Sequence, residues 1–132
     1  MAAITIEYLG DLRCRVLGPE MLVTDTPRDL QGLGEKISPT DLVAAALGSC
    51  ILSVLGAKAR ALKIDIAGAT ATVEKEMVSP VGMFKKLGVT IHVPQEVLED
   101  HKIRLAQAAH LCPVHKSLHP DVQAPIEFFW GE

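Results

Sequence analysis

The sequence predicts an α+β fold in a single domain covering residues 1–132. Three strand-like segments precede one long apolar helix, and the segments after it do not show the regular strand, helix, strand repeat of a doubly wound sheet. The length is usual for one domain, and 22% charged and 48% hydrophobic residues are typical of a globular chain. We therefore expect one folded α+β unit.

The first three segments are predicted to be short strands. Apolar residues occupy every second position in 4–8 and in 12–16, which is the spacing of strands buried on one side. A third strand is expected over 21–24, after a turn at Gly18-Pro19. Residues 25–36 are polar and contain several glycines, so they predict a loop.

A long helix is predicted to begin at Pro39 and to end near Leu62. Ser38 can cap its free N–H groups, Pro39 suits the first helical position, and Asp41 favours the positive end of the dipole. The helix is apolar on nearly all sides as far as Ala57, so we expect it to be buried on most sides. Its many small residues would let neighbouring backbones approach, either in a sheet wrapped around it or in a dimer.

The second half of the chain predicts a hairpin, two helices and a closing strand. The expected elements are strands over 69–76 and 86–93, helices over 95–110 and 113–118, and a strand over 122–130. Pro125 lacks an N–H to donate, so it should place the last strand at a sheet edge or at a bulge.

Charge and length argue against nucleic-acid and membrane partners. The net charge is −3 and the pI about 5.9, so no basic field is available for phosphate or anionic lipid. The uncharged run from Leu42 to Ala57 is shorter than the roughly 20 residues that span a bilayer. The start of the chain shows no secretory signal, and three widely spaced cysteines make no disulfide framework, so we expect a reducing, cytoplasmic location.

Cys50 is the first candidate for a reactive residue. It lies twelve residues after Ser38, too deep in its helix for the helix dipole to lower the pKa of its thiol. A reactive Cys50 therefore requires a cation from elsewhere in the fold, and Arg13 or Arg15, on one face of a predicted strand, can supply it. From composition alone, Cys50 is expected to be a small core residue, because free cysteines are among the most buried residues.

Cys112 is predicted to have a different environment. It directly precedes Pro113, so it can occupy the N-cap of the short helix, where free N–H groups stabilise a thiolate. We therefore expect Cys112 to be the more acidic of the two thiols, unless it is only a turn residue. Cys14 alternates with two arginines and is expected to lie in the core.

A zinc site near Cys112 is not expected. His110, Cys112, His115 and His119 have a spacing that matches no common zinc framework, in which paired ligands face each other. His115 and His119 are more simply a pair on a helix surface. No nucleotide-binding, serine hydrolase or zinc protease motif is present in the sequence.

Two motifs together resemble the OsmC/Ohr family, which comprises osmotically inducible protein C and organic hydroperoxide resistance proteins. They are SPTDLVAAALGSC at 38–50, which is similar to the OsmC-like branch, and LCPVHKSLHPDV at 111–122. The order of elements matches the family over essentially the whole chain. The resemblance implies an OsmC-like fold with antiparallel sheets wrapped around a long central helix, in an intertwined homodimer with active sites at the subunit interface.

The resemblance also implies an activity, that of a cysteine-based organic hydroperoxide reductase. Cys50 corresponds to the peroxidatic thiol, which becomes a sulfenic acid, and Cys112 to the resolving thiol, which forms a disulfide with it. The substrates implied are organic, fatty-acid-like hydroperoxides. The reductant implied is a dithiol such as a lipoylated protein, and no metal or other cofactor is required.

The family holds its thiolate with an N-terminal arginine, which maps onto Arg13, with Arg15 as the second choice. A glutamate ten residues before the peroxidatic cysteine orients that arginine in the family, and here Thr40 occupies the position. Asp41 or Glu35 is expected to replace it. An alternative hypothesis is an OsmC-like module that binds an apolar small molecule at the dimer interface. Leu47 and neighbouring apolar residues are expected to shape the pocket in either case.

Overall fold

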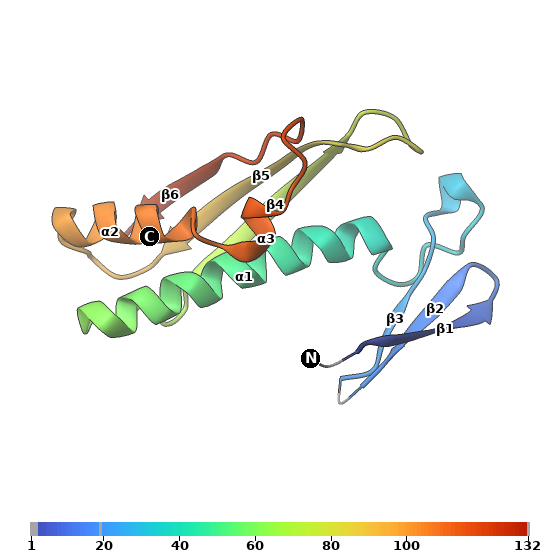
Figure 1. The fold of residues 1–132 in the computed structure, drawn as a ribbon, viewed down its shortest axis with the longest axis horizontal. Helices are drawn as coiled ribbons and strands as arrows, with labels where there is room; N and C mark the ends of the chain where they lie inside the picture. Colours follow the sequence, from blue (N-terminus) through green and yellow to red (C-terminus); the bar gives the residue numbers. More distant parts are fainter. Residues whose placement is uncertain (1–2, 19, 132) are drawn as a thin grey trace. The chain divides into compact units, whose positions relative to one another are not determined.

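The computed structural model describes residues 3–18 and 20–131, which form two compact units, 1–43 and 44–132 (Figure 1). Helix α1 begins in the first unit and continues through the second. The prediction that residues 1–132 make one domain stays a prediction. The elements in chain order are β1 (Thr5–Gly10), β2 (Arg13–Leu17), β3 (Leu22–Thr24), η1 (Arg28–Leu30), α1 (Pro39–Leu62), β4 (Thr70–Met77), β5 (Phe84–Val93), α2 (Glu99–Ala109), α3 (Pro113–Lys116) and β6 (Ile126–Trp130).

The first unit contains a three-stranded antiparallel sheet in the order β1-β2-β3. Cys14 lies at its centre and pairs with Tyr8 on one side and with Thr24 on the other. All three strands were predicted, and the loop that follows contains the short 3₁₀ turn η1. Pro19, half of the predicted Gly18-Pro19 turn, lies outside the described residues.

The second unit contains a sheet in the order β4-β5-β6. The hairpin β4–β5 is antiparallel, as predicted, but β6 pairs with β5 in parallel, so this sheet is mixed rather than wholly antiparallel. The reason is the connection: α2 and α3 carry the chain back along the sheet, so that β6 enters in the same direction as β5. As Pro125 predicts, β6 lies at the sheet edge and begins directly after this proline.

One face of the second sheet carries the hydrophobic core. Every second residue of β5 points into it, and α1 and α2 pack on the same face (Figure 1). The fully buried large residues of this core are Leu47, Ile51, Leu55, Leu87, Val89, Ile91, Val93 and Leu105. Gly48 sets the closest approach of helix and sheet, because a Cβ there would lie 3.2 Å from Val73 Cγ2.

Helix α1 begins and ends where predicted, but within the chain it is buried on one side only. The side away from the sheet consists of small residues that remain exposed: Ala45, Ala46, Ser49, Ser53, Gly56 and Ala57. The expectation of burial on most sides was therefore wrong for the single chain. Apolar composition indicates that a helix can be buried all round, whereas within the chain only the side of α1 that carries Leu47, Ile51 and Leu55 is buried.

Among the described residues, α1 is the one helix long and apolar enough to cross a membrane by length and composition, with a mean hydropathy of 1.8 over 18 residues. Its run of uncharged residues is nevertheless flanked by Asp41 and Lys58. Its buried side packs on the second sheet together with α2. This is the arrangement of a core helix in a soluble domain.

Helix α2 is shorter than predicted because it begins at Glu99 rather than near residue 95. The preceding segment is held in an extended form, in which Gln95 Nε2 donates to the carbonyl of Ala67 at 2.7 Å. Two apolar residues of this region, Ile103 in α2 and Leu111 after it, are exposed. The buried side of α2 is formed by Leu105 and the alanines near its end.

The packing of the core predicts that substitution of two different leucines by alanine changes the free energy of unfolding by very different amounts. Leu47→Ala removes a fully buried side chain and should lower the free energy of unfolding by about 2–5 kcal/mol. Leu98→Ala removes a side chain that is 72% exposed and should change it by less than about 0.5 kcal/mol. Urea unfolding at one fixed protein concentration measures both, and equal losses would contradict this description of the core.

Candidate functional site

Cys50 and Cys112 come together in the second unit. Cys50 lies in the middle of α1, and Cys112 is the N-cap of α3, directly after α2. The two side chains lie within hydrogen-bonding reach of each other. Cys112 Sγ also accepts a hydrogen bond of 3.4 Å from the backbone N–H of His115, so the predicted N-cap is confirmed.

The predicted acidity of Cys112 is wrong. Its side chain is completely buried, and this burial, together with the contact with Cys50, raises the pKa of the Cys112 thiol. The N–H groups of His115 and Val114 act in the opposite direction, as expected of an N-cap, but are outweighed. Cys112 is therefore a protonated thiol at neutral pH.

Cys50 is half-buried, whereas Cys112 is buried, so Cys50 is the more exposed residue of the pair. Leu47 and Ile51, on either side of it in α1, are 0% exposed and belong to the core. These two residues therefore do not line a substrate pocket within the chain, whereas Val54, the third apolar residue expected to shape the pocket, is half-buried, and its role stays a prediction.

Arg13 lies in the first unit and is held by two carboxylates. Its Nη2 donates to Asp25 Oδ2 at 3.3 Å and to Glu35 Oε1. Glu35 was predicted as a partner of this arginine, and the structure confirms the contact. Asp25 was not predicted as a partner of Arg13, although a carboxylate directly after a strand, next to a strand with two arginines, is a usable signal.

Asp25 is buried and fully engaged. It is 1% exposed; Oδ2 accepts the N–H of Glu35 at 3.0 Å and Oδ1 that of Thr26 at 2.8 Å. These bonds, led by that from Glu35, and the charge of Arg13 overcome desolvation and hold the pKa of Asp25 below its usual 3.8. For Arg13, desolvation is outweighed by the bonds to Glu35 and Asp25, which raise its pKa.

The start of α1 is capped as predicted. Ser38 Oγ accepts the N–H of Asp41 at 3.1 Å and lies 3.3 Å from Thr40 Oγ1. Thr40, which occupies the position of the family glutamate, thus belongs to the capping group. The expectation that Asp41 orients Arg13 stays a prediction.

The other candidate residues of the first sheet have different surroundings. Arg15, the second choice for the cation, pairs with Glu7 across the strands at 2.7 Å, and both side chains are well exposed. Cys14 is half-buried rather than part of the core.

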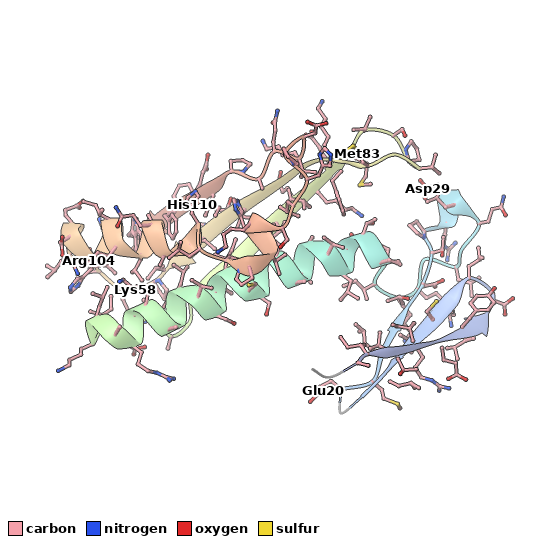
Figure 2. All side chains as sticks on the ribbon, viewed as in Figure 1. Glu20, Asp29, Lys58, Met83, Arg104 and His110 are labelled. Carbon is pink, nitrogen blue, oxygen red and sulfur yellow. The ribbon has the colours of Figure 1, made fainter. Side chains whose placement is uncertain are left out.

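The histidines near Cys112 have partners of their own. His115 Nε2 lies 2.8 Å from the carbonyl of Ala124, and His110, at the end of α2 (Figure 2), places Nδ1 3.1 Å from the carbonyl of Ala106. His119 lies outside α3 and accepts the N–H of Asp121, so it is not part of a helix-surface pair. Over residues 3–18 and 20–131, no cluster of His, Cys, Asp and Glu has an arrangement that could hold a metal.

Comparison with known proteins links this fold to one family. The family model for OsmC-like protein matches residues 32–127. A crystal structure from Psychrobacter arcticus 273-4, of a protein named for osmotic stress induction and a detoxification response, is similar to the chain. It has 38% identity and a TM-score of 0.91, over 98% of this chain and 96% of that one.

More distant structures share the fold. The organic hydroperoxide resistance protein OsmC from Legionella pneumophila is 22% identical, with a TM-score of 0.76 and 97% of each chain covered. The organic hydroperoxide resistance protein OhrB of Bacillus subtilis is 20% identical, with a TM-score of 0.68 and 98% of each chain covered. A search of curated proteins found no match.

The environment of Cys112 predicts slow chemical modification. In reduced native protein at neutral pH, iodoacetamide should alkylate Cys112 at least about tenfold more slowly than Cys50, because Cys112 is buried and protonated. Peptide mass spectrometry over time measures both rates, and the same reaction in denaturant should remove the difference. Equal rates in the native protein would contradict the described burial.

Asp25 predicts a pH-dependent contribution to stability. Because its folded-state pKa is lowered, its contribution is complete above the ordinary value of 3.8 and is lost as pH falls through the folded-state value. Asp25→Asn should therefore lower the free energy of unfolding at pH 7, and the difference in this free energy from the wild type should narrow only as pH falls below 3.8. Urea unfolding at several pH values tests this, with Glu7→Gln as the exposed control. A gap independent of pH would show that the charge of Asp25 does not stabilise the fold.

Proposed function

Because the chain belongs to the OsmC-like protein family, we propose that it is a thiol peroxidase that reduces organic hydroperoxides. The observation that carries this proposal is the pairing of an accessible thiol, Cys50, with a buried one, Cys112. Support also comes from relatives of the same fold that are named organic hydroperoxide resistance proteins.

In the first step, the Cys50 thiolate attacks the terminal oxygen of the hydroperoxide. The O–O bond breaks, the sulfur becomes a sulfenic acid, and the alkoxide takes a proton and leaves as an alcohol. The Cys112 thiol, which is protonated and lies within hydrogen-bonding reach of Cys50, is the proposed hydrogen-bond donor to the Cys50 sulfur before this step.

In the second step, Cys112 attacks the sulfur of the Cys50 sulfenic acid. A disulfide forms, and the hydroxyl group leaves with the proton of Cys112 as water, so no external base is required. The two thiols supply both electrons that reduce the hydroperoxide. A dithiol, such as that of a lipoylated protein, would return them through thiol–disulfide exchange, without a metal or flavin.

Arg13 is the proposed cation for the Cys50 thiolate. The structure shows an arginine whose position is fixed by Asp25 and Glu35, whereas Arg15 has only an exposed partner. A guanidinium close to a thiolate lowers its pKa by about one unit or more. This supplies the activation that the middle of α1 cannot provide.

We propose that the active protein is a cytoplasmic homodimer. The exposed side of α1 is made of alanine, glycine and serine, which permit close approach of a second copy. A reducing compartment would keep the three cysteines free between turnovers.

Turnover with single cysteine variants tests the proposal. With dihydrolipoamide as the reductant, cumene hydroperoxide should be consumed by the wild type and by Cys14→Ser at similar rates. Cys50→Ser should abolish consumption, since it removes the group that attacks the peroxide, and Cys112→Ser should lower it by at least about tenfold.

Turnover that survives Cys50→Ser would contradict the proposal. The same variants also distinguish the peroxidase from the alternative function, a non-catalytic binding module. Absence of turnover in the wild type, together with binding of an apolar ligand that Cys50→Ala leaves unchanged, would favour the module.

A further inference from the structure

We propose that Asp25 is the positioning residue of Arg13 and performs here the orienting role that the family assigns to a glutamate at the position of Thr40. The inference rests on the proposed function, in which Arg13 stabilises the Cys50 thiolate. It names a residue that touches neither thiol nor hydroperoxide in that proposal and acts only through the arginine.

Asp25 itself is held in place by hydrogen bonds to the backbone. Its carboxylate accepts the N–H groups of Thr26 and Glu35, and its own N–H donates to the carbonyl of Ile37 at 3.0 Å. The side chain is buried, and these hydrogen bonds tie it to the backbone that leads into α1. An arginine bonded to such a carboxylate has a defined direction.

Glu35, the other carboxylate bonded to Arg13, differs from Asp25 in its exposure to solvent. The side chain of Glu35 is 58% exposed, whereas that of Asp25 is 0% exposed, although both accept from the same nitrogen of Arg13. An exposed ion pair contributes little to fixing a side chain, because solvent competes for both partners. Asp25 is therefore the anchor and Glu35 a secondary partner.

Arg13 has a further guanidinium donor, Nη1, that these two carboxylates do not use. Both carboxylates use Nη2, and Nη1 donates to neither of them. Arginine presents its donors in a rigid plane, so fixing Nη2 also fixes the direction of Nη1. The Nη1 group is therefore free of these two carboxylates to donate to a second anion. In the proposed function, this anion is the thiolate of Cys50.

Arg15 offers an internal control for this reasoning. It lies two residues from Arg13 on the same strand and pairs with Glu7, but this pair is exposed on both sides and has no buried carboxylate. If any arginine–carboxylate pair of the hairpin were sufficient, loss of Glu7 would have the same effect as loss of Asp25.

The pH dependence of Cys50 alkylation tests the proposal without any hydroperoxide. Reduced protein is treated with iodoacetamide between about pH 5 and 9, and mass spectrometry of the Cys50 peptide gives the apparent pKa. Arg13→Gln should raise it by about one unit, and Asp25→Asn by a similar amount, with a fivefold to tenfold lower alkylation rate at pH 7 as a rough expectation. Glu7→Gln should leave it unchanged, and Glu35→Gln should shift it by less than Asp25→Asn.

The double variant separates positioning from general loss of structure. If Asp25 acts through Arg13, Asp25→Asn should add no further shift in the Arg13→Gln background, whereas an independent structural effect would add to it. An apparent pKa unchanged in Asp25→Asn but raised in Arg13→Gln would overturn the role of Asp25 alone. An apparent pKa unchanged in Arg13→Gln would overturn the pairing of Arg13 with Cys50, and with it that part of the proposed function.

A second variant keeps the test valid if Asp25→Asn does not fold. Arg13→Lys retains the positive charge but replaces the planar guanidinium by a single ammonium group. If a fixed geometry is required, Arg13→Lys should raise the apparent pKa of Cys50 nearly as much as Arg13→Gln. An unchanged value would show that charge alone suffices and would overturn the proposal.

Discussion

The burial of the Cys112 thiol beside Cys50 is the constraint on which the second unit's chemistry depends. Cys112 reaches this position because α2 packs its last turn into the core and the chain then turns sharply into α3. Cys50 reaches it because the cap at Ser38 fixes where α1 begins and its bulky side faces the sheet. The same packing that stabilises the fold therefore brings two redox-capable sulfurs into contact.

This burial also gives the two thiols different reactivities. A buried thiol with a raised pKa is a poor nucleophile and a poor target for oxidants in bulk water, so in the proposed mechanism Cys112 reacts only with a sulfenic acid formed beside it. Cys50 is accessible but lies too deep in its helix to be activated by the dipole. The first unit holds an arginine fixed by two carboxylates, which is the kind of group that such a thiol requires.

Local patterns in the sequence were sufficient for the parts of the structure that depend on local interactions. The start of α1, the N-cap role of Cys112 and the presence of strand β5 follow from neighbouring residues, and all three were predicted. The pKa of Cys112 was not, because burial by distant segments outweighs the local N–H groups. Asp25 was missed because its role arises from long-range contacts, and the parallel pairing of β6 depends on the path of α2 and α3.

Disulfide mapping after exposure to one equivalent of cumene hydroperoxide tests the central claim most directly. The fully reduced protein is oxidised, its remaining thiols are blocked under denaturing conditions, and the non-reduced digest is analysed by mass spectrometry. The account predicts one intramolecular disulfide between Cys50 and Cys112, with Cys14 recovered as a blocked thiol. Recovery of both Cys50 and Cys112 as free thiols, or a disulfide that includes Cys14 instead, would contradict it.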